Sequence, residues 1–198
     1  MFRALSTLTV ITAISTQPAL ADDTAQYGIG IGFSPFGGSI NGQYHASKKT
    51  SFNVALGGSP EMDSFMKADI GGTEFSQTGS STWVGAFINH RPFDNANWFR
   101  FVGGIGIGSI SSELYDGNGN VYSVEYNENP VGYVGIGFGN SAKKGFQVGF
   151  DLGWLQTSGP EIQKIDGSDD EDLSDSIDGQ IGFGSVLPNL QLSLGYNF

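Results

Sequence analysis

Leu187-Pro-Asn-Leu-Gln-Leu-Ser-Leu-Gly-Tyr-Asn-Phe198 closes the chain, and a large apolar residue occupies every second position from Leu190 onward. These positions are Leu190, Leu192, Leu194, Tyr196 and Phe198, and the residues between them are small or polar. A period of two places the large side chains on one face of a β-strand. The stretch therefore predicts a C-terminal strand with one apolar face, ending on an aromatic ring beside the terminal carboxylate.

This ending resembles the terminal strand of Gram-negative outer-membrane β-barrels, in which the final aromatic residue and the alternating residues before it serve as an assembly signal. The resemblance implies that the outer-membrane barrel-assembly machinery recognises Leu190, Leu192, Leu194, Tyr196 and Phe198. The remaining sequence should then contain further strands with the same two-residue period.

Residues 1–21 read as a separate leader. Arg3 supplies a positive end, residues 4–14 are mainly apolar, and Ala19-Leu20-Ala21 has the small residues of a cleavage site. We interpret the leader as a secretory signal peptide that is removed, which leaves residues 22–198 as one domain. A retained amphipathic helix is the alternative, and the absence of a helical stripe of apolar residues disfavours it.

The composition excludes several classes of protein. Hydrophobic residues make up 38% of the chain and form no long run after the leader, which disfavours a helical membrane protein. There are no cysteines, so neither disulfides nor thiol chemistry are available. Without Arg3, 8 basic and 20 acidic residues give a net charge of about -12, which disfavours nucleic-acid binding.

Glycine is unusually frequent: it makes up 31 of 198 residues, about 16%, whereas average proteins contain about 7% glycine. The chain has no Gly-X-Y period and is rich in aromatic residues, so these glycines belong to ordered strands. In 27–33 and 98–109, glycines and small residues occupy the face opposite the apolar one. Such a face suits the inside of a narrow barrel, where space is scarce.

Eight segments show the strand period. They are 27–33, 39–47, 51–58, 80–91, 98–109, 130–139, 145–157 and 190–198. Most have the length that a tilted strand needs to cross a bilayer. In 80–91, Val84, Ala86 and Ile88 point outward if Asn89 points inward. The pattern predicts an all-β protein, an eight-stranded antiparallel up-and-down transmembrane β-barrel.

The links between these segments alternate in length and charge. Those after the second, fourth and sixth strands are short and hold Lys48, Lys49, Arg91, Lys143 and Lys144. Those after the third, fifth and seventh, 59–79, 110–129 and 158–186, are long and hold sixteen of the 20 acids. Outer-membrane barrels have short periplasmic turns and longer external loops. Both termini are therefore expected in the periplasm, and the protein in the outer membrane of a Gram-negative cell.

The whole of 22–198 resembles the small eight-stranded outer-membrane barrels that include the transmembrane domain of OmpA, OmpX and OmpW. The run Gly132-Tyr-Val-Gly-Ile-Gly-Phe-Gly-Asn140 also looks like uncharacterised proteobacterial outer-membrane proteins. A soluble lipocalin-type barrel is the alternative, but glycine rows such as 28, 30 and 32 make poor solvent-facing surfaces. The resemblance implies lipid and lipopolysaccharide as surroundings and a monomeric state.

Two charged residues fall on the inward face, Arg100 in 98–109 and Asp151 in 145–157. An unpaired charge in a narrow, low-dielectric interior is costly, so we expect these two to pair, directly or through a neighbour. Eight strands leave an interior just wide enough for side chains. The lumen is therefore expected to be filled by side chains, with Arg100 and Asp151 as a structural pair in preference to an ion relay.

His45 and Ser47 lie on one face of their segment and resemble the histidine and serine of outer-membrane lipid A deacylases. The match is poor because Lys48 stands where an amide is expected and no acid is placed to orient the histidine. We therefore predict no catalytic residues, no enzyme activity and no cofactor. The enzyme remains an alternative hypothesis.

Two acidic stretches have the oxygen ligands that Ca²⁺ or Mg²⁺ prefers. The first is Asp116-x-Asn118-x-Asn120, and the second comprises Asp166, Asp169, Asp170, Glu171, Asp172, Asp175 and Asp178. Neither completes an EF-hand: in the first, Val121 stands where glycine is required and Asn127 where glutamate is required. Solvated acidic loops are the first interpretation, and divalent cations bridging them to lipopolysaccharide are the alternative.

These observations predict a non-catalytic outer-membrane barrel with a structural or surface-interaction role through acidic external loops. The alternative, by resemblance to OmpW, is a binder or narrow conduit for small hydrophobic molecules. Such a conduit needs an apolar cavity, which the glycine lining does not indicate. Fold alone does not choose between these functions.

Overall fold

The structure is a computed structural model that describes residues 23–64, 67–70, 72–127, 130–139, 141–167, 177, 180 and 182–198. The predicted signal peptide, 1–21, lies outside the described residues. So do six acids of the second acidic stretch: Asp169, Asp170, Glu171, Asp172, Asp175 and Asp178.

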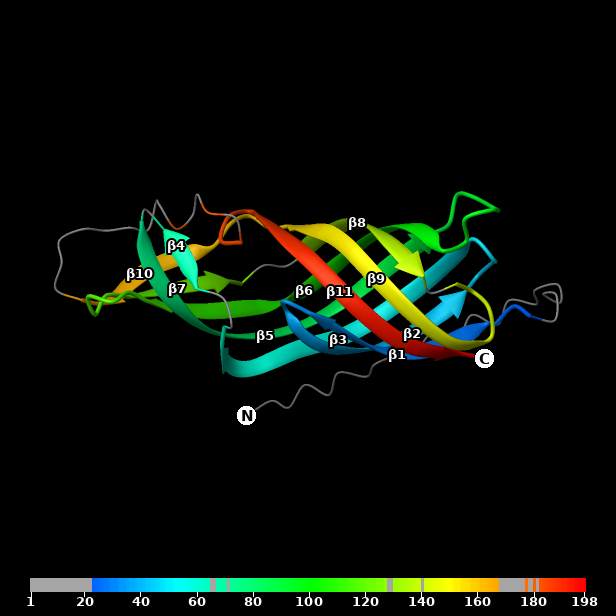
Figure 1. The fold of residues 1–198 in the computed structure, drawn as a ribbon, viewed down its shortest axis with the longest axis horizontal. Helices are drawn as coiled ribbons and strands as arrows, with labels where there is room; N and C mark the ends of the chain where they lie inside the picture. Colours follow the sequence, from blue (N-terminus) through cyan, green and yellow to red (C-terminus); the bar gives the residue numbers. More distant parts are fainter. Residues whose placement is uncertain are drawn as a thin grey trace, which may run out of the picture.

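Within the described residues, the chain folds into eleven antiparallel strands (Figure 1). They are β1 (Tyr27–Ser34), β2 (Gly37–His45), β3 (Thr50–Asp63), β4 (Ala68–Ile70), β5 (Thr73–His90), β6 (Phe99–Tyr115), β7 (Val121–Tyr126), β8 (Val131–Gly139), β9 (Gly145–Gln156), β10 (Glu161–Asp166) and β11 (Val186–Asn197). Eight of them, β1, β2, β3, β5, β6, β8, β9 and β11, pair in a closed ring. The ring closes where β1 pairs with β11. We call this ring the barrel.

The tilt of the barrel strands follows from their register. Paired residues followed once around the ring are Asn197, Gly28, Gln43, Asn53, Phe87, Gly104, Tyr133, Leu155 and Leu187. The path returns to β11 ten residues before its start, from Asn197 to Leu187. At about 3.3 Å per residue and about 4.8 Å between strands, this stagger tilts the strands by roughly 40°.

Apolar side chains cover the outside of the barrel, because each strand alternates as the sequence indicated. On β11, Leu190, Leu192, Leu194 and Tyr196 are exposed, whereas Asn189, Ser193 and Asn197 are buried. On β5, Ile88 was expected to point outward if Asn89 points inward. Asn89 is buried and Ile88 is 50% exposed, so the strand has this orientation. The barrel is thus apolar outside and polar inside.

Inward-facing glycines make room for large interior side chains. A Cβ at Gly104 would collide with the ring of Phe87, and one at Gly57 with the indole of Trp83. Phe87 in turn meets Tyr133 edge-on, with ring centroids 5.6 Å apart. These aromatic side chains occupy the space that the missing Cβ atoms leave.

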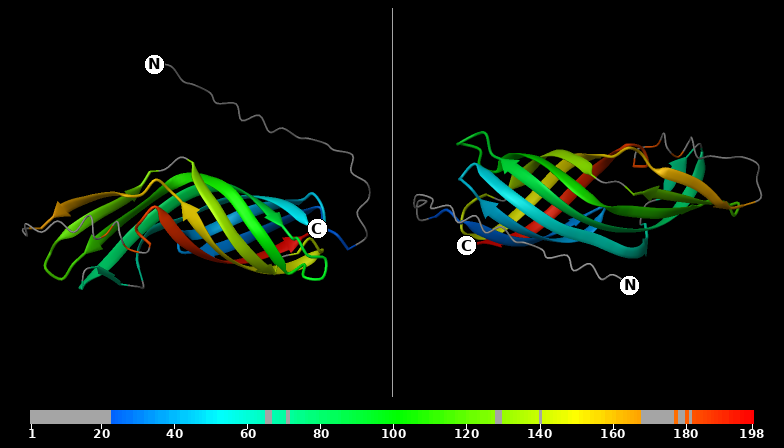
Figure 2. Two further views of the ribbon diagram at one scale, coloured as in Figure 1. Left: turned by 90° about the horizontal axis from the view of Figure 1, so that it is seen from above. Right: turned by 180° about the vertical axis from the view of Figure 1, so that it is seen from behind.

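Much of what the sequence pattern assigned to long loops is strand. β5 begins at Thr73 and β6 continues to Tyr115, so both project past the barrel (Figure 2). There β4 pairs with β5, β7 pairs with β6, and β10 pairs with β7. We call β4, β7, β10 and residues 73–79 and 110–115 the extension. Prediction of 59–79, 110–129 and 158–186 as loops throughout was therefore wrong. The overlooked signal is the alternation of Tyr122, Val124 and Tyr126 in β7.

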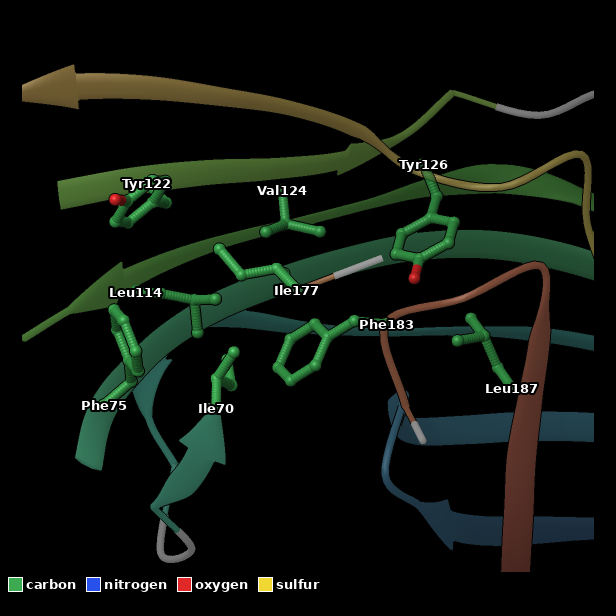
Figure 3. Packing of buried hydrophobic residues seen from close by; sticks show 9 residues of the cluster. All are labelled: Ile70, Phe75, Leu114, Tyr122, Val124, Tyr126, Ile177, Phe183 and Leu187. Carbon is green, nitrogen blue, oxygen red and sulfur yellow. The ribbon is translucent and has the colours of Figure 1, made fainter. Parts of the chain in front are cut away.

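A hydrophobic cluster explains why the extension folds (Figure 3). Its members are Ile70, Phe75, Leu114, Tyr122, Val124, Tyr126, Ile177, Phe183 and Leu187. Phe75 and Tyr122 meet edge-on with centroids 6.0 Å apart. Partly buried Phe36 and Leu155 join this cluster to the barrel. The extension therefore has a core of its own at the end of the barrel away from the C-terminus (Figure 1).

Candidate functional site: the barrel interior

Arg100 on β6 and Asp151 on β9 meet inside the barrel, over Gly137 of β8, the strand between them. Arg100 Nη2 lies 2.8 Å from Asp151 Oδ1 and 2.7 Å from Asp151 Oδ2. Arg100 is 3% exposed and Asp151 8%. The structure thus brings the two residues together in a direct ion pair, without a bridging residue.

Further contacts complete the hydrogen bonding of Arg100. Its Nε donates to Asn89 Oδ1 at 3.1 Å, and its Nη1 donates to the carbonyls of Phe138 and Gly139 at 3.3 and 2.6 Å. A Cβ at Gly137 would lie 2.6 Å from Arg100 Nε, so only glycine leaves this guanidinium in place. A buried charge held by a counterion and several acceptors is one that a barrel interior can tolerate.

A second polar cluster closes the interior at the C-terminal end of the barrel. His45, Ser51, Arg91 and Asn197 are between 0% and 2% exposed, and we call them the terminal cluster. His45 Nδ1 lies 2.7 Å from Ser51 Oγ, and Arg91 Nη1 donates to the same oxygen at 3.1 Å. Asn197 Nδ2 donates to the carbonyl of Ser141 at 2.8 Å.

This cluster corrects one interpretation of the sequence and adds two residues to the interior. Arg91 was grouped with the basic residues of the short links, but its side chain turns into the barrel and is 1% exposed. Arg91 is the first residue after β5, so its position in the chain placed it in the link although its side chain lies in the interior. Ser51 and Asn197 were not singled out, although their inward parity on β3 and β11 indicated them.

Residues 23–26 form a strap over the same end. The N–H of Ala25 donates to Ala142 O at 2.9 Å, and the N–H of Gln26 donates to Phe198 O at 3.1 Å. The N–H of His45 donates to Gln26 O at 2.9 Å. The strap therefore ties the link before β9 to the end of β2, above the terminal cluster.

The pairing of His45 with Ser47 that suggested a deacylase is not present. His45 contacts Ser51, whereas Ser47 Oγ accepts hydrogen bonds from the N–H groups of Lys49 and Thr50 in the turn before β3. Since His45 and Ser51 are both 0% exposed, this imidazole and hydroxyl do not meet a substrate in this conformation. The geometry is that of a structural contact.

A cavity of about 130 Å³ occupies the interior between the Arg100–Asp151 pair and the extension. Its wall includes Asn53, Trp83, Phe87, Tyr133 and Asn189. The expectation of a lumen completely filled by side chains was therefore wrong for this part of the barrel. The inward-facing glycines explain this cavity, because the rings of Trp83, Phe87 and Tyr133 do not fill all the interior volume that the glycines leave open.

The residues expected to form the assembly signal lie on β11 and at its end. Leu190, Leu192, Leu194, Tyr196 and Phe198 are between 43% and 55% exposed on the outer face. The N–H of Phe198 donates to Tyr27 O at 2.8 Å, which extends the β1 to β11 contact to the last residue. Their recognition by assembly machinery stays a prediction.

The Asp116 stretch is a self-contained turn in the extension. Asp116 Oδ1 accepts hydrogen bonds from the N–H groups of Asn118 and Asn120 at 2.9 and 2.8 Å, and Oδ2 accepts from Asn120 Nδ2 at 2.7 Å. Burial raises the pKa of the Asp116 carboxyl, but these hydrogen bonds outweigh it and hold the pKa below its ordinary value. Among the described residues, no three His, Cys, Asp or Glu side chains gather as a metal site would require. Divalent-cation binding stays the alternative hypothesis for this turn.

Among the residues that the structure describes, no helix is long and apolar enough to span a membrane. No protein-family model and no curated sequence matches the chain. Solved structures do. CarO from Acinetobacter baumannii superposes with a TM-score of 0.66 at 13% identity, over 88% of this chain and 98% of CarO. CarO2 of the same organism gives 0.66 at 14% identity, over 89% and 100%.

A major outer membrane protein from Thermus thermophilus is also similar, with a TM-score of 0.50 at 16% identity, over 87% of this chain and 98% of that protein. The chain has the fold of an outer-membrane β-barrel. These similarities support an outer-membrane β-barrel and do not single out the family of OmpA, OmpX and OmpW.

Proposed function

We propose that the mature chain, residues 22–198, is a monomeric barrel of the Gram-negative outer membrane, with a non-catalytic structural or surface-contact role. Both termini would face the periplasm and the extension the cell exterior, next to lipopolysaccharide. One observation carries the proposal, namely the apolar outer face around a polar interior. Ile105 is 61% and Val148 60% exposed, while Arg100 and Asp151 are buried. In water such a surface would be a large aggregation site, whereas hydrocarbon suits it.

Charge and aromatic residues support the orientation. Lys48, Lys143 and Lys144 are exposed in the short links at the C-terminal end. Aromatic rings gather there too, and Trp98 stacks on Phe138 with centroids 6.0 Å apart. Aromatic residues of barrels form girdles at the two membrane interfaces. The acidic residues of the extension, by contrast, would lie outside the membrane.

Topology can be tested with a reagent for thiols, because the chain has no cysteine of its own. Asn118→Cys places a thiol in the extension and Lys48→Cys places one in the link after β2. A membrane-impermeant maleimide should label Asn118→Cys in intact cells, and Lys48→Cys only after the outer membrane is opened. Equal labelling of both in intact cells would refute the orientation.

The closed interior argues against passage of solutes. The terminal cluster is buried at one end, and the Arg100–Asp151 pair lies further in, over Gly137 of β8. In planar bilayers we expect no sustained large openings, and their appearance would refute a closed barrel. The OmpW-like alternative, a binder or narrow conduit for small hydrophobic molecules, has support in the apolar part of the cavity wall, where Trp83, Phe87 and Leu155 lie. The amides of Asn41, Gln43 and Gln191 on the same wall favour a ligand that also carries polar groups.

The lipid-modifying enzyme remains the third hypothesis, and it now concerns Ser51 instead of Ser47. Membrane lipids from cells producing the Ser51→Ala variant should match those from cells producing the wild type. A modification present only with the wild type would overturn the non-catalytic proposal.

A further inference from the structure

The cavity inside the barrel is a chamber with one closed end. Its wall runs from Arg100 and Asp151 to Ser34 and Thr157, which lie where β1 and β9 end beside the extension. Beyond the ion pair, the terminal cluster fills the interior. A solute that enters at the extension would therefore be held and not passed on.

The chamber wall contains hydrogen-bond acceptors without a partner. Asn189 is 8% exposed; its amide group interacts with the Tyr133 hydroxyl, but its Oδ1 accepts no hydrogen bond. The Oδ1 of Asn53, on the same wall, is also buried and unpaired. Leaving a buried acceptor unpaired costs about 1–3 kcal/mol. Among the described residues of the wall, no buried side-chain donor lacks a hydrogen-bond partner. The unpaired groups are acceptors, so the wall favours a ligand with hydrogen-bond donors.

The charges of the wall are compensated. Arg100 and Asp151 are the ionised side chains that line the chamber among the described residues, and they pair with each other. A charged ligand would lose its hydration without finding an opposite charge, which is costly in a buried site. The wall therefore favours an uncharged ligand.

Aromatic side chains give the chamber flat apolar surfaces. Trp83 holds its Nε1 on the carbonyl of Phe36 at 3.0 Å, so the indole is fixed in orientation. Phe87 and Tyr133 form a second, edge-on aromatic pair. At about 10–15 Å³ per water-sized group, 130 Å³ holds roughly ten such groups. The cavity volume is thus smaller than that of the pockets that usually bind drug-sized ligands.

We propose that this chamber is a binding site for an uncharged, hydroxyl-bearing ring compound of monosaccharide size. Hydroxyl groups would donate to Asn189 Oδ1 and Asn53 Oδ1, and the C–H face of the ring would lie against an aromatic side chain. The inference goes beyond the structural role proposed above. It does not depend on membrane orientation, so the two can fail separately.

The test uses the mature chain in detergent micelles, with Trp98→Phe and Trp154→Phe so that Trp83 is the remaining indole. D-glucose, methyl glucoside, cyclohexanol and lysine are titrated while Trp83 fluorescence is followed. A saturable change with the two sugars, weakened roughly three- to tenfold by Asn189→Leu through loss of one hydrogen bond, is expected. Asn95→Leu, in the exposed link after β5, is the matched control and should bind as the parent does.

Asn53→Leu is the second variant, in case Asn189→Leu does not fold, and the mobility of unheated samples in gel electrophoresis reports folding. No saturable change with either sugar would overturn the proposal. So would unchanged affinity in a folded Asn189→Leu or Asn53→Leu variant, or tighter binding of cyclohexanol or lysine than of the sugars. In each of those cases the acceptors of the wall do not define the ligand.

Discussion

Replacing Asp151 by asparagine tests the central contact of the barrel. Asp151→Asn keeps the side-chain size but removes the charge opposite Arg100, whose guanidinium is 3% exposed. Two charge-assisted hydrogen bonds, at 2.8 and 2.7 Å, are lost or weakened. The buried guanidinium is then left without a counterion.

The magnitude follows from what remains. Breaking a buried ion pair by removing one partner costs about 3–5 kcal/mol. Arg100 keeps its hydrogen bonds to Asn89 and to two carbonyls, so the lower part of that range applies, about 3–4 kcal/mol. With a urea slope of about 2 kcal/mol per molar, the unfolding midpoint should fall by about 2 M.

The assay is equilibrium unfolding by urea in detergent micelles, followed by tryptophan fluorescence. Asp94→Asn is the matched control, because Asp94 pairs with Lys49 at 2.8 Å but its side chain is 86% exposed. An exposed pair contributes about 0–1 kcal/mol, so the control midpoint should move by less than about 0.5 M.

A paired replacement separates loss of the ion pair from damage to packing. Arg100→Met with Asp151→Leu removes both charges, and the double variant should be more stable than Asp151→Asn alone. A loss below about 1 kcal/mol in Asp151→Asn, or a double variant less stable than the single one, would refute the account of the pair as a compensated buried charge.

Three further predictions concern other parts of the chain. Gly137→Ala should lower the free energy of unfolding by about 1–3 kcal/mol in the same urea assay, because the added Cβ would lie 2.6 Å from Arg100 Nε. Gly103→Ala is the control, since no atom lies within 4 Å of its added Cβ, and it should change the free energy of unfolding by less than about 0.5 kcal/mol. Equal losses in the two variants would refute the steric argument. The hydrogen bonds to the Asp116 carboxylate stabilise the turn at pH values above the ordinary carboxyl pKa of 3.8, and this stabilisation is lost as the pH falls through the lower pKa of the folded state. An NMR titration should therefore give the Asp116 carboxyl a pKa below 3.8. A pKa at or above 3.8 would contradict the hydrogen-bond argument. Phe198→Ala should reduce the folded fraction recovered from outer membranes more than Phe146→Ala, a 75% exposed ring on β9; similar yields would remove the assembly role of the terminal residue.

The sequence was sufficient for the barrel strands because their signal is local. A residue of a strand faces lipid or lumen according to its parity, so Ile88 and Asn89 could be placed on opposite faces from neighbouring residues alone. The same parity put Arg100 and Asp151 inside. Because a buried charge without a counterion is costly and the interior holds few charged residues, the contact between Arg100 and Asp151 could be predicted from the sequence.

Contacts between distant segments could not be obtained in this way. His45 contacts Ser51 and not Ser47, because the register of β2 with β3 pairs those two positions across the turn. Arg91 joins them from forty residues away. Strand period says which face a residue occupies, but not which residue of another strand lies opposite, since that depends on how each pair of strands is staggered.

Local alternation thus determined that this chain forms strands with an apolar face and a small or polar face. Tertiary structure alone decided the stagger of ten residues around the ring, the terminal cluster, the chamber and the extension. The physical reason is that strand formation follows from each segment's own pattern, whereas interior volume and long-range contacts depend on the register of every strand pair at once.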